Sequence, residues 1–272
     1  MTNETSRGVE WAALLKEAVV RPGMILEAYS NFHNFSLGNC LLACLQCQER
    51  GIPFGPIATY KRWQELGRQV RKGEKALTLC MPVTRKGNKK AKQQDAEIEL
   101  DEQESAYTFF VYRPRWFVLS QTEGEDVEPE PIPGWEKEQA LRELRIAEER
   151  FEDPNGNVQG YSVPGGKIAI SPLAQLPSKT LFHELAHQLL GHVGDQTIIE
   201  GDRLPKNLRE AEAESVALIC CEALRLEGAP YCRGYIQTWL AGDEIPEKSA
   251  QRIFAAAERI LRVGAARPLE PV

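Results

Sequence analysis

The sequence predicts an α+β protein of two domains, with antiparallel strands in the first and mainly helices plus a small β-hairpin in the second. The chain has 272 residues, which is long for one domain and sufficient for two. Strand-like runs follow helices in the first half, whereas helical spacing of apolar residues dominates the second. Residues 121–134 are rich in Glu, Pro and Gly, as linkers often are. We therefore expect domains at 1–122 and 136–272, joined by a linker at 123–135.

The first domain is expected to begin with helices and to continue with strands. Apolar periodicity, a Thr59 N-cap and glycines placed as terminators predict helices at 9–20, 37–49 and 60–66. Runs of β-branched and aromatic residues predict strands at 76–83 and 107–119. The polar segment 85–104 between these strands is expected to form a long hairpin loop.

The second domain is expected to combine helices with one hairpin. The turn Pro164-Gly165-Gly166 separates two short strand-like runs at 160–163 and 167–171. The second run is expected to be an edge strand that can pair with an extended peptide. Periodicity, with a Ser178 N-cap and a terminating Gly191 for the second, predicts helices at 136–150, 178–190, 207–226, 230–240 and 247–263.

The composition predicts a folded, cytoplasmic protein with reduced thiols. Hydrophobic residues make up 42% and charged residues 26% of the chain. No apolar run approaches the ~20 residues that span a bilayer, and the N-terminus is polar and acidic. The seven cysteines are odd in number and lack a regular disulfide spacing. Five of them fall at expected helix-core positions, namely Cys40, Cys44, Cys47, Cys220 and Cys221.

The most informative motif is the stretch from His183 to His187, which reads His-Glu-Leu-Ala-His. Residues four apart lie on one face of a helix, so both imidazoles can reach one Zn²⁺ ion. In such a site the metal activates a water for peptide or amide hydrolysis, and Glu184 is the expected proton acceptor. The alternative is a chance match whose histidines form ordinary core hydrogen bonds. Candidates for a group that donates a hydrogen bond to the substrate are Tyr161, His192 and Arg203.

A third protein ligand is needed for a catalytic zinc with one open position. The pattern in which a third histidine follows the motif is excluded, because Leu190 and Val193 occupy the required glycine and histidine positions. The next predicted helix offers three glutamates. Glu210 and Glu214 share a face at i and i+4, so we favour Glu210 as the ligand and Glu214 as the partner of a ligand histidine. Glu212 is expected to be exposed, but it remains an alternative ligand, as does Glu214.

A basic stretch in the first domain contrasts with the net charge of −6. Between Lys61 and Lys92 there are eleven Lys or Arg residues against two acids. Cations interleaved with aromatic rings are typical of single-stranded nucleic-acid sites, where phosphates contact the cations and bases stack on the rings. The alternative is that the rings belong to the core. The candidate DNA-binding residues are Tyr60, Lys61, Arg62, Trp63, Arg68, Arg71, Lys72, Lys75, Arg113 and Arg115.

Several ordered motifs resemble a known family. The segments at 58–63, 67–75 and 117–122 resemble the N-terminal domain of ArdC-type antirestriction proteins, over residues 25–122. That domain is described as binding single-stranded DNA. The second half resembles the zincin-like metallopeptidase domain paired with it, related to the ImmA/IrrE group. Its match at Glu210-x-x-Ala213-Glu214 implies Glu210 as the third ligand.

The resemblance implies a mobile-element protein that shields incoming single-stranded DNA from host restriction and carries a zinc peptidase site. One alternative is a non-catalytic DNA-binding shield whose zinc is structural or vestigial. Another is a regulatory protease that cleaves one partner protein.

Overall fold

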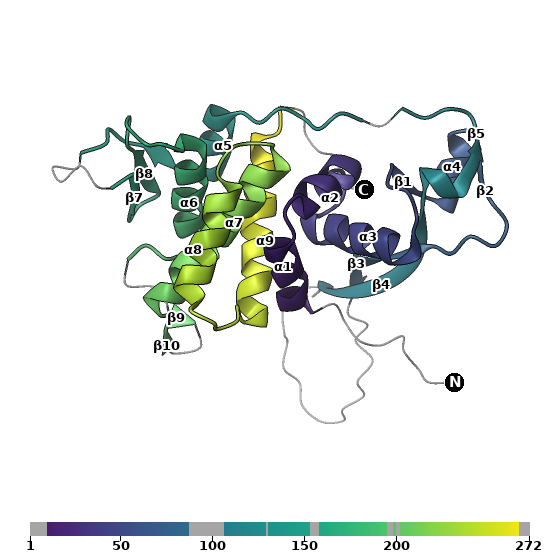
Figure 1. Cartoon of the computed structure of the whole chain (residues 1–272). Helices are drawn as coiled ribbons and strands as arrows, with labels where there is room; N and C mark the ends of the chain where they lie inside the picture. The colour runs from purple at the N-terminus through teal and green to yellow at the C-terminus, as the bar shows by residue number, and fades with distance from the viewer. Residues whose placement is uncertain are drawn as a thin grey trace, which may run out of the picture.

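The computed structural model describes residues 10–86, 106–128, 130–152, 158–194, 198–199 and 202–266 (Figure 1). These residues form an α+β fold whose antiparallel sheets lie mainly in the first half and whose second half is mainly helical. The fold class predicted from the sequence is therefore confirmed. Most of the predicted loop at 85–104 lies outside the described residues.

Three helices begin the described chain: α1 (Trp11–Val20), α2 (Met24–Phe32) and α3 (Leu37–Arg50). The first and third match the helices predicted from apolar periodicity. Gly51 ends α3 in the left-handed conformation, at φ 63°, as its position predicted. The three cysteines on α3 are buried and unpaired, which confirms that they are core residues.

A three-stranded antiparallel sheet follows, in the order β1-β4-β3. Its strands are β1 (Ile57–Thr59), β3 (Leu77–Lys86) and β4 (Ala106–Val118). Helix α3 packs against β3, and the Asn39 side chain joins them by bonding both the N–H and the C=O of Cys80. Thr59 caps the short helix α4 (Tyr60–Glu65), since its hydroxyl accepts a bond from the Arg62 amide at 3.3 Å. Beside it, β2 (Arg68–Val70) pairs with β5 (Thr122–Gly124) after the 3₁₀ turn η1 (Leu119–Gln121).

The second half begins with a helix that is shorter than predicted. Helix α5 (Lys137–Leu144) ends at Arg145, which adopts a left-handed conformation at φ 57°. The chain then turns so that Ile146 is buried and β6 (Ala147–Glu148) pairs in parallel with β8 (Lys167–Ile170). Pairing with the sheet thus replaces the last turns expected for this helix.

The predicted hairpin is present, but its strands have a different order from the one expected. The sheet runs β6-β8-β7, with β7 (Gly160–Val163) antiparallel to β8. The strand predicted to be an edge is therefore central. Among the described strands, β6 and β7 are the two edges of this sheet, and β7 is the edge that contacts α6.

The remaining elements are α6 (Pro177–Leu189), β9 (Ile198–Ile199), β10 (Asp202–Arg203), α7 (Lys206–Ala223), α8 (Ala229–Leu240) and α9 (Glu247–Gly264). Helix α7 is central and packs against α6, α8, α9 and α2. Every residue from 211 to 223 is consequently buried. Helices with no solvent face are unusual in small domains, and this one forms the middle of the molecule.

The two halves are in direct contact (Figure 1). The Glu247 carboxylate, at the start of α9, accepts bonds from the Trp11 and Ala12 amides at 2.9 and 2.8 Å, so it caps α1. Glu222 on α7 accepts a bond from the Ile25 amide at 3.1 Å in the first turn of α2. One continuous apolar core therefore runs through both halves. The boundaries at 122 and 136 stay a prediction.

In the part of the chain that the structure describes, no helix combines the length and apolar character needed to cross a bilayer.

Candidate metal centre

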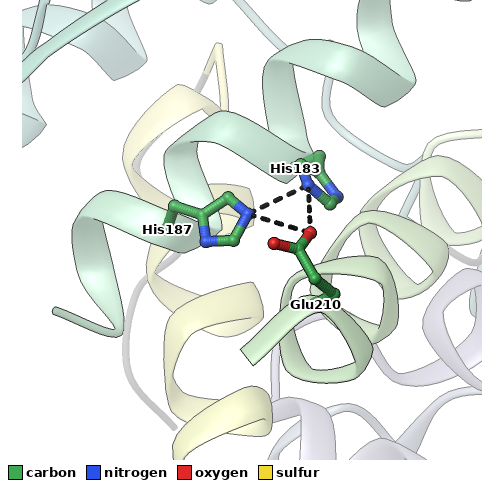
Figure 2. A group of neighbouring side chains, drawn as sticks. All are labelled: His183, His187 and Glu210. Carbon is green, nitrogen blue, oxygen red and sulfur yellow. Dashed lines mark hydrogen bonds and ion pairs between the residues drawn. The ribbon is translucent and has the colours of Figure 1, made fainter. Parts of the chain in front are cut away.

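Three side chains predicted as metal ligands converge between α6 and α7 (Figure 2). The Nε2 atoms of His183 and His187, one turn apart on α6, are 3.0 Å from each other. The Glu210 Oε2 atom on α7 is 3.4 Å from the first Nε2 and 3.6 Å from the second. Among the described residues, this is the one group of histidine, cysteine and acidic side chains compact enough to hold a metal ion.

The outer nitrogen of His183 faces a carboxylate. Its Nδ1 atom is 3.3 Å from Oε1 of Glu214, one turn after Glu210 on the same face of α7. The same oxygen is 2.6 Å from the ammonium group of Lys179, which lies one turn before His183 on α6. Glu214 thus occupies the place that the sequence predicted for the partner of a ligand histidine.

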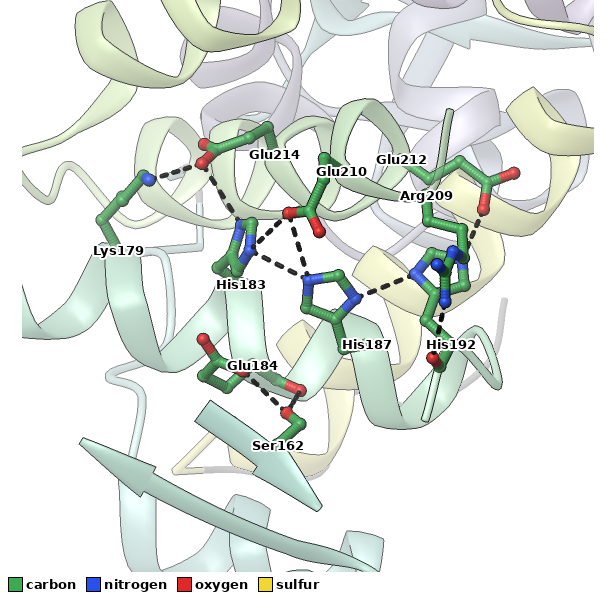
Figure 3. Close-up of polar contacts among 10 residues, drawn as sticks. All are labelled: Ser162, Lys179, His183, Glu184, His187, His192, Arg209, Glu210, Glu212 and Glu214. Carbon is green, nitrogen blue, oxygen red and sulfur yellow. Dashed lines mark hydrogen bonds and ion pairs between the residues drawn. The ribbon is translucent and has the colours of Figure 1, made fainter. Parts of the chain in front are cut away.

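The outer nitrogen of His187 faces a second histidine (Figure 3). Its Nδ1 atom is 3.1 Å from Nδ1 of His192, whose Nε2 atom is 2.7 Å from Oε2 of Glu212. The expectation that Glu212 is exposed was wrong, because its side chain is fully buried. Periodicity correctly separated it from Glu210 and Glu214, but α7 is covered on all sides, so that face is buried too.

His192 was also a candidate to donate a hydrogen bond to a substrate. Its side chain is 1% exposed and lies behind the His187 ring, which excludes direct substrate contact in this conformation. The Tyr161 hydroxyl is near the Arg150 carbonyl and the Glu152 amide. The side chain of Arg203 falls outside the described part of the structure.

Glu184 lies on the side of α6 that faces strand β7 (Figure 3). Its carboxylate accepts a hydrogen bond of 2.8 Å from the Ser162 hydroxyl, which is also 2.9 Å from the Glu184 carbonyl oxygen. Gly160 permits this close approach of strand and helix. A Cβ atom there would lie 2.7 Å from Thr180 Cγ2 and 3.3 Å from Glu184 Cγ. Ser162 was missed in the sequence, since only the pairing of β7 against α6 places it beside the glutamate.

In the metal-free site, the neighbouring carboxylates favour the protonated form of His183. Burial lowers the pKa of His183, but the neighbouring Glu210 and Glu214 carboxylates outweigh burial and raise that pKa to about 9. Burial opposes ionisation of Glu210, yet the bonds from both histidines hold its pKa well below the usual range. For His192, burial outweighs the nearby Glu212 and lowers the pKa. The site therefore stabilises a positive charge between His183 and its two carboxylates.

The candidate DNA-binding residues do not all lie on the surface. Trp63 is 1% exposed and its indole N–H donates to the Phe117 carbonyl at 2.9 Å, so its assignment as a DNA-stacking residue was wrong. Trp63 thus lies on the side of α4 that contacts β4. The guanidinium of Arg68 bonds Thr122 and the backbone carbonyls of residues 122, 124 and 125, which gives it a structural partner.

The other candidates keep solvent-accessible side chains. Tyr60 is 44% exposed, and the exposed cations are Lys61, Arg62, Arg71, Lys72, Lys75, Arg113 and Arg115. Tyr60, Arg71 and Lys72 line one hollow of about 500 Å³, together with Phe117 and two acids, Glu74 and Glu123. Lys61 and Arg62 lie nearby on α4 but pair with Glu65. The structure thus brings three of the predicted residues to one hollow.

Comparisons with known proteins give one family match for the first half and structural matches for the whole chain. Residues 10–113 match the family described as the N-terminal domain of anti-restriction factor ArdC. No curated protein matches the chain in sequence. The metal-free crystal structure of the antirestriction protein ArdC from the R388 plasmid is 19% identical and superposes with a TM-score of 0.51, over 93% of this chain and 97% of that one. The Mn(II)-bound structure of that protein gives 20% identity and a TM-score of 0.49, over 95% and 99%.

The sequence match covers the first half, whereas the structural similarity covers nearly the whole length of both chains. Residues 10–113 therefore form an ArdC-type N-terminal domain, and the chain as a whole has a fold similar to that of ArdC.

Proposed function

We propose that this chain is an antirestriction protein that binds single-stranded DNA and holds one Zn²⁺ ion in a peptidase-type site. The observation that carries the proposal is the convergence of His183, His187 and Glu210 on one point between two helices. The N-terminal domain match supports the DNA-binding and antirestriction part. Such a protein of a mobile element is expected in the cytoplasm, where incoming DNA meets restriction enzymes.

The donor set fits a zinc ion. Tetrahedral zinc with bonds of ~2.0–2.1 Å separates its ligand atoms by about 3.3 Å. The three separations in this site, 3.0, 3.4 and 3.6 Å, bracket that value. The outer nitrogen of each histidine has a partner of its own, so both Nε2 atoms are left to face the shared point. Two imidazoles and one carboxylate are the ligands of many peptidase zinc sites.

Glu184 is the residue we assign to proton transfer. A zinc ion bound here would act as a Lewis acid on the substrate carbonyl and on a water. The Glu184 carboxylate would accept the proton of the attacking water and deliver it to the leaving amine. Ser162 holds one carboxylate oxygen at 2.8 Å, which limits the orientations that the group can adopt. The free edge of β7 would align an extended peptide beside this helix.

The proposed DNA surface centres on the hollow beside Tyr60. A base can stack on the exposed Tyr60 ring, while Arg71 and Lys72 contact the flanking phosphates. Glu74 at the same hollow lies 3.2 Å from the Arg71 guanidinium, so a phosphate would compete with this carboxylate for Arg71. The remaining exposed cations, Lys61, Arg62, Lys75, Arg113 and Arg115, extend the contact along the strand.

A DNA-binding shield with a structural metal is the second candidate. The contact between Glu184 and Ser162 favours it, because in the structure that carboxylate lies on the β7 side of α6 rather than among the ligands (Figure 3). A regulatory protease with one partner protein remains the third reading. Glu184 separates these candidates, because it is needed for hydrolysis in the two peptidase candidates and not needed in the DNA-binding shield.

The test compares Glu184→Ala with His183→Ala and the wild type. Metal analysis after dialysis without chelator should give about one zinc per chain in the wild type and in Glu184→Ala, and none in His183→Ala. Protection of incoming single-stranded DNA against a restriction enzyme should fall in both variants if hydrolysis is required. If Glu184→Ala protects as well as the wild type, the shield replaces the peptidase. Absence of metal from the wild type would reject the metal site altogether.

A further inference from the structure

We propose that His192 and Glu212 are positioning residues that hold His187 with its Nε2 atom toward the metal. This inference rests on the proposed metal site and assigns two residues that the ligand motif does not contain. The three side chains form a chain of contacts, with 3.1 Å between the two histidine rings and 2.7 Å from the second ring to the carboxylate (Figure 3).

The backbone at the end of α6 places His192 on His187. The His192 amide bonds the His187 carbonyl at 2.9 Å, and the Gly191 amide bonds the Gln188 carbonyl at 3.3 Å. This pair of bonds is a Schellman motif, in which the glycine adopts a left-handed conformation, here at φ 71°. The motif brings the residue after the glycine back over the last turn of the helix. The two rings therefore meet because Gly191 ends α6 at that point.

Hydrogen-bond chemistry then leaves one consistent assignment of protons. A neutral imidazole has one donor and one acceptor nitrogen. If Nε2 of His187 faces the metal, its proton is on Nδ1, which donates to Nδ1 of His192. His192 must then carry its proton on Nε2, which donates to Glu212. Every donor nitrogen then faces an acceptor. Because the Glu212 carboxylate can only accept, it fixes the direction of both hydrogen bonds in this series.

Burial makes this assignment strict. The side chains of His192 and Glu212 are 1% and 0% exposed, so bulk water does not compete for their polar atoms. Arg252 on α9 lies 3.8 Å from the other Glu212 oxygen and also donates to the Leu190 carbonyl, so it balances the buried negative charge. The two ligand histidines are thus held by two carboxylates of α7, one through direct contact and one through His192.

Partners of ligand histidines affect metal affinity by about 10- to 100-fold when removed. His192→Phe keeps a ring in the buried space but removes both nitrogens. Glu212→Gln keeps an oxygen that can accept from His192 and removes the charge. The matched control is Glu222→Gln, another buried carboxylate on α7 with an arginine partner, Arg233, and no contact with the site.

The dissociation constant for Zn²⁺ should be measured by competition with a chromophoric chelator for all three variants. We expect His192→Phe to weaken binding by about 10- to 100-fold, Glu212→Gln to weaken it less, and Glu222→Gln to match the wild type. Equal affinities of His192→Phe and wild type would overturn the proposal.

Nitrogen-detected NMR of the wild-type histidines gives a second readout that does not depend on how the variants fold. The zinc-loaded protein should show the Nδ1–H form of His187 and the Nε2–H form of His192. An Nδ1–H form of His192 would contradict the proposed series of hydrogen bonds from His187 through His192 to Glu212. If the wild type binds no zinc, the proposed function fails. The positioning role of His192 is then tested separately, by which of its ring nitrogens carries the proton in the metal-free protein.

Discussion

The ammonium group of Lys179 lies 2.6 Å from the Glu214 carboxylate, and both side chains are largely buried beside His183, at 14% and 4% exposure. Removing one member of a buried ion pair leaves the other charge without compensation, which costs about 3–5 kcal/mol. We expect Lys179→Met to lower the free energy of unfolding of the metal-free protein by that amount. Urea denaturation followed by circular dichroism measures it.

The matched control is Lys137→Met, which removes a lysine that is 2.6 Å from Glu148. These side chains are 37% and 30% exposed, so solvent replaces much of the lost interaction. Its expected effect is within about 1 kcal/mol. If both variants lose a similar free energy of unfolding, burial does not strengthen the Lys179–Glu214 pair.

The raised pKa of His183 predicts that the metal-free protein is less stable at alkaline pH. Its pKa is about 9 in the folded state, against ~6.5 for an unperturbed histidine. Protonated His183 therefore adds stability that is fully present below pH ~6.5 and is lost as the pH rises through about 9. The loss should be on the order of 1–3 kcal/mol. Urea denaturation of chelator-treated protein at pH 6, 7.5 and 9 tests this, and His183→Gln should flatten the dependence.

The cluster of His183, His187 and Glu210 could be predicted from the sequence because the relevant geometry is local. The spacing of His183 and His187 places both rings on one helix face, and Glu210 and Glu214 repeat that spacing on the next helix. Only the antiparallel packing of two successive helices was needed to join the two pairs. The short Nε2 separation of 3.0 Å follows from that arrangement.

The surroundings of this cluster could not be predicted, because they depend on how many faces of a helix are covered. Periodicity shows that Glu212 lies away from Glu210, but not that α9 and the end of α6 cover that side of α7. The same limit explains Trp63, which follows two cations in sequence but whose ring is buried, with its indole N–H bonded to the Phe117 carbonyl of β4. Sequence spacing assigns residues to faces, and only tertiary packing decides which faces meet solvent.

Tyr60 and Trp63 should respond in opposite ways to substitution. Tyr60 is 44% exposed and its hydroxyl accepts a bond from Gln69 at 2.7 Å, so Tyr60→Ala should leave the fold intact and weaken binding of single-stranded DNA by about 1–3 kcal/mol. Trp63 is buried, so Trp63→Ala should cost about 3–5 kcal/mol of stability. Fluorescence anisotropy with a labelled oligonucleotide and thermal unfolding separate the two effects. Unchanged DNA affinity in Tyr60→Ala would reject the hollow as the DNA site.

Gly160 should be a position where one methyl group disturbs Glu184, the residue proposed for proton transfer. The added Cβ would lie 2.7 Å from Thr180 Cγ2, 3.1 Å from the Ala169 carbonyl and 3.3 Å from Glu184 Cγ, so β7 must move away from α6. We expect Gly160→Ala to lower stability by about 1–3 kcal/mol, the usual cost of overpacking, and to reduce any hydrolysis because Ser162 moves with the strand. The control is Gly234→Ala, in α8, where a Cβ meets nothing within 4 Å. That change should stabilise the helix by up to about 1 kcal/mol. Thermal unfolding of both variants distinguishes them, and a Gly160→Ala variant as stable as the wild type would show that the strand does not need its close approach to Glu184.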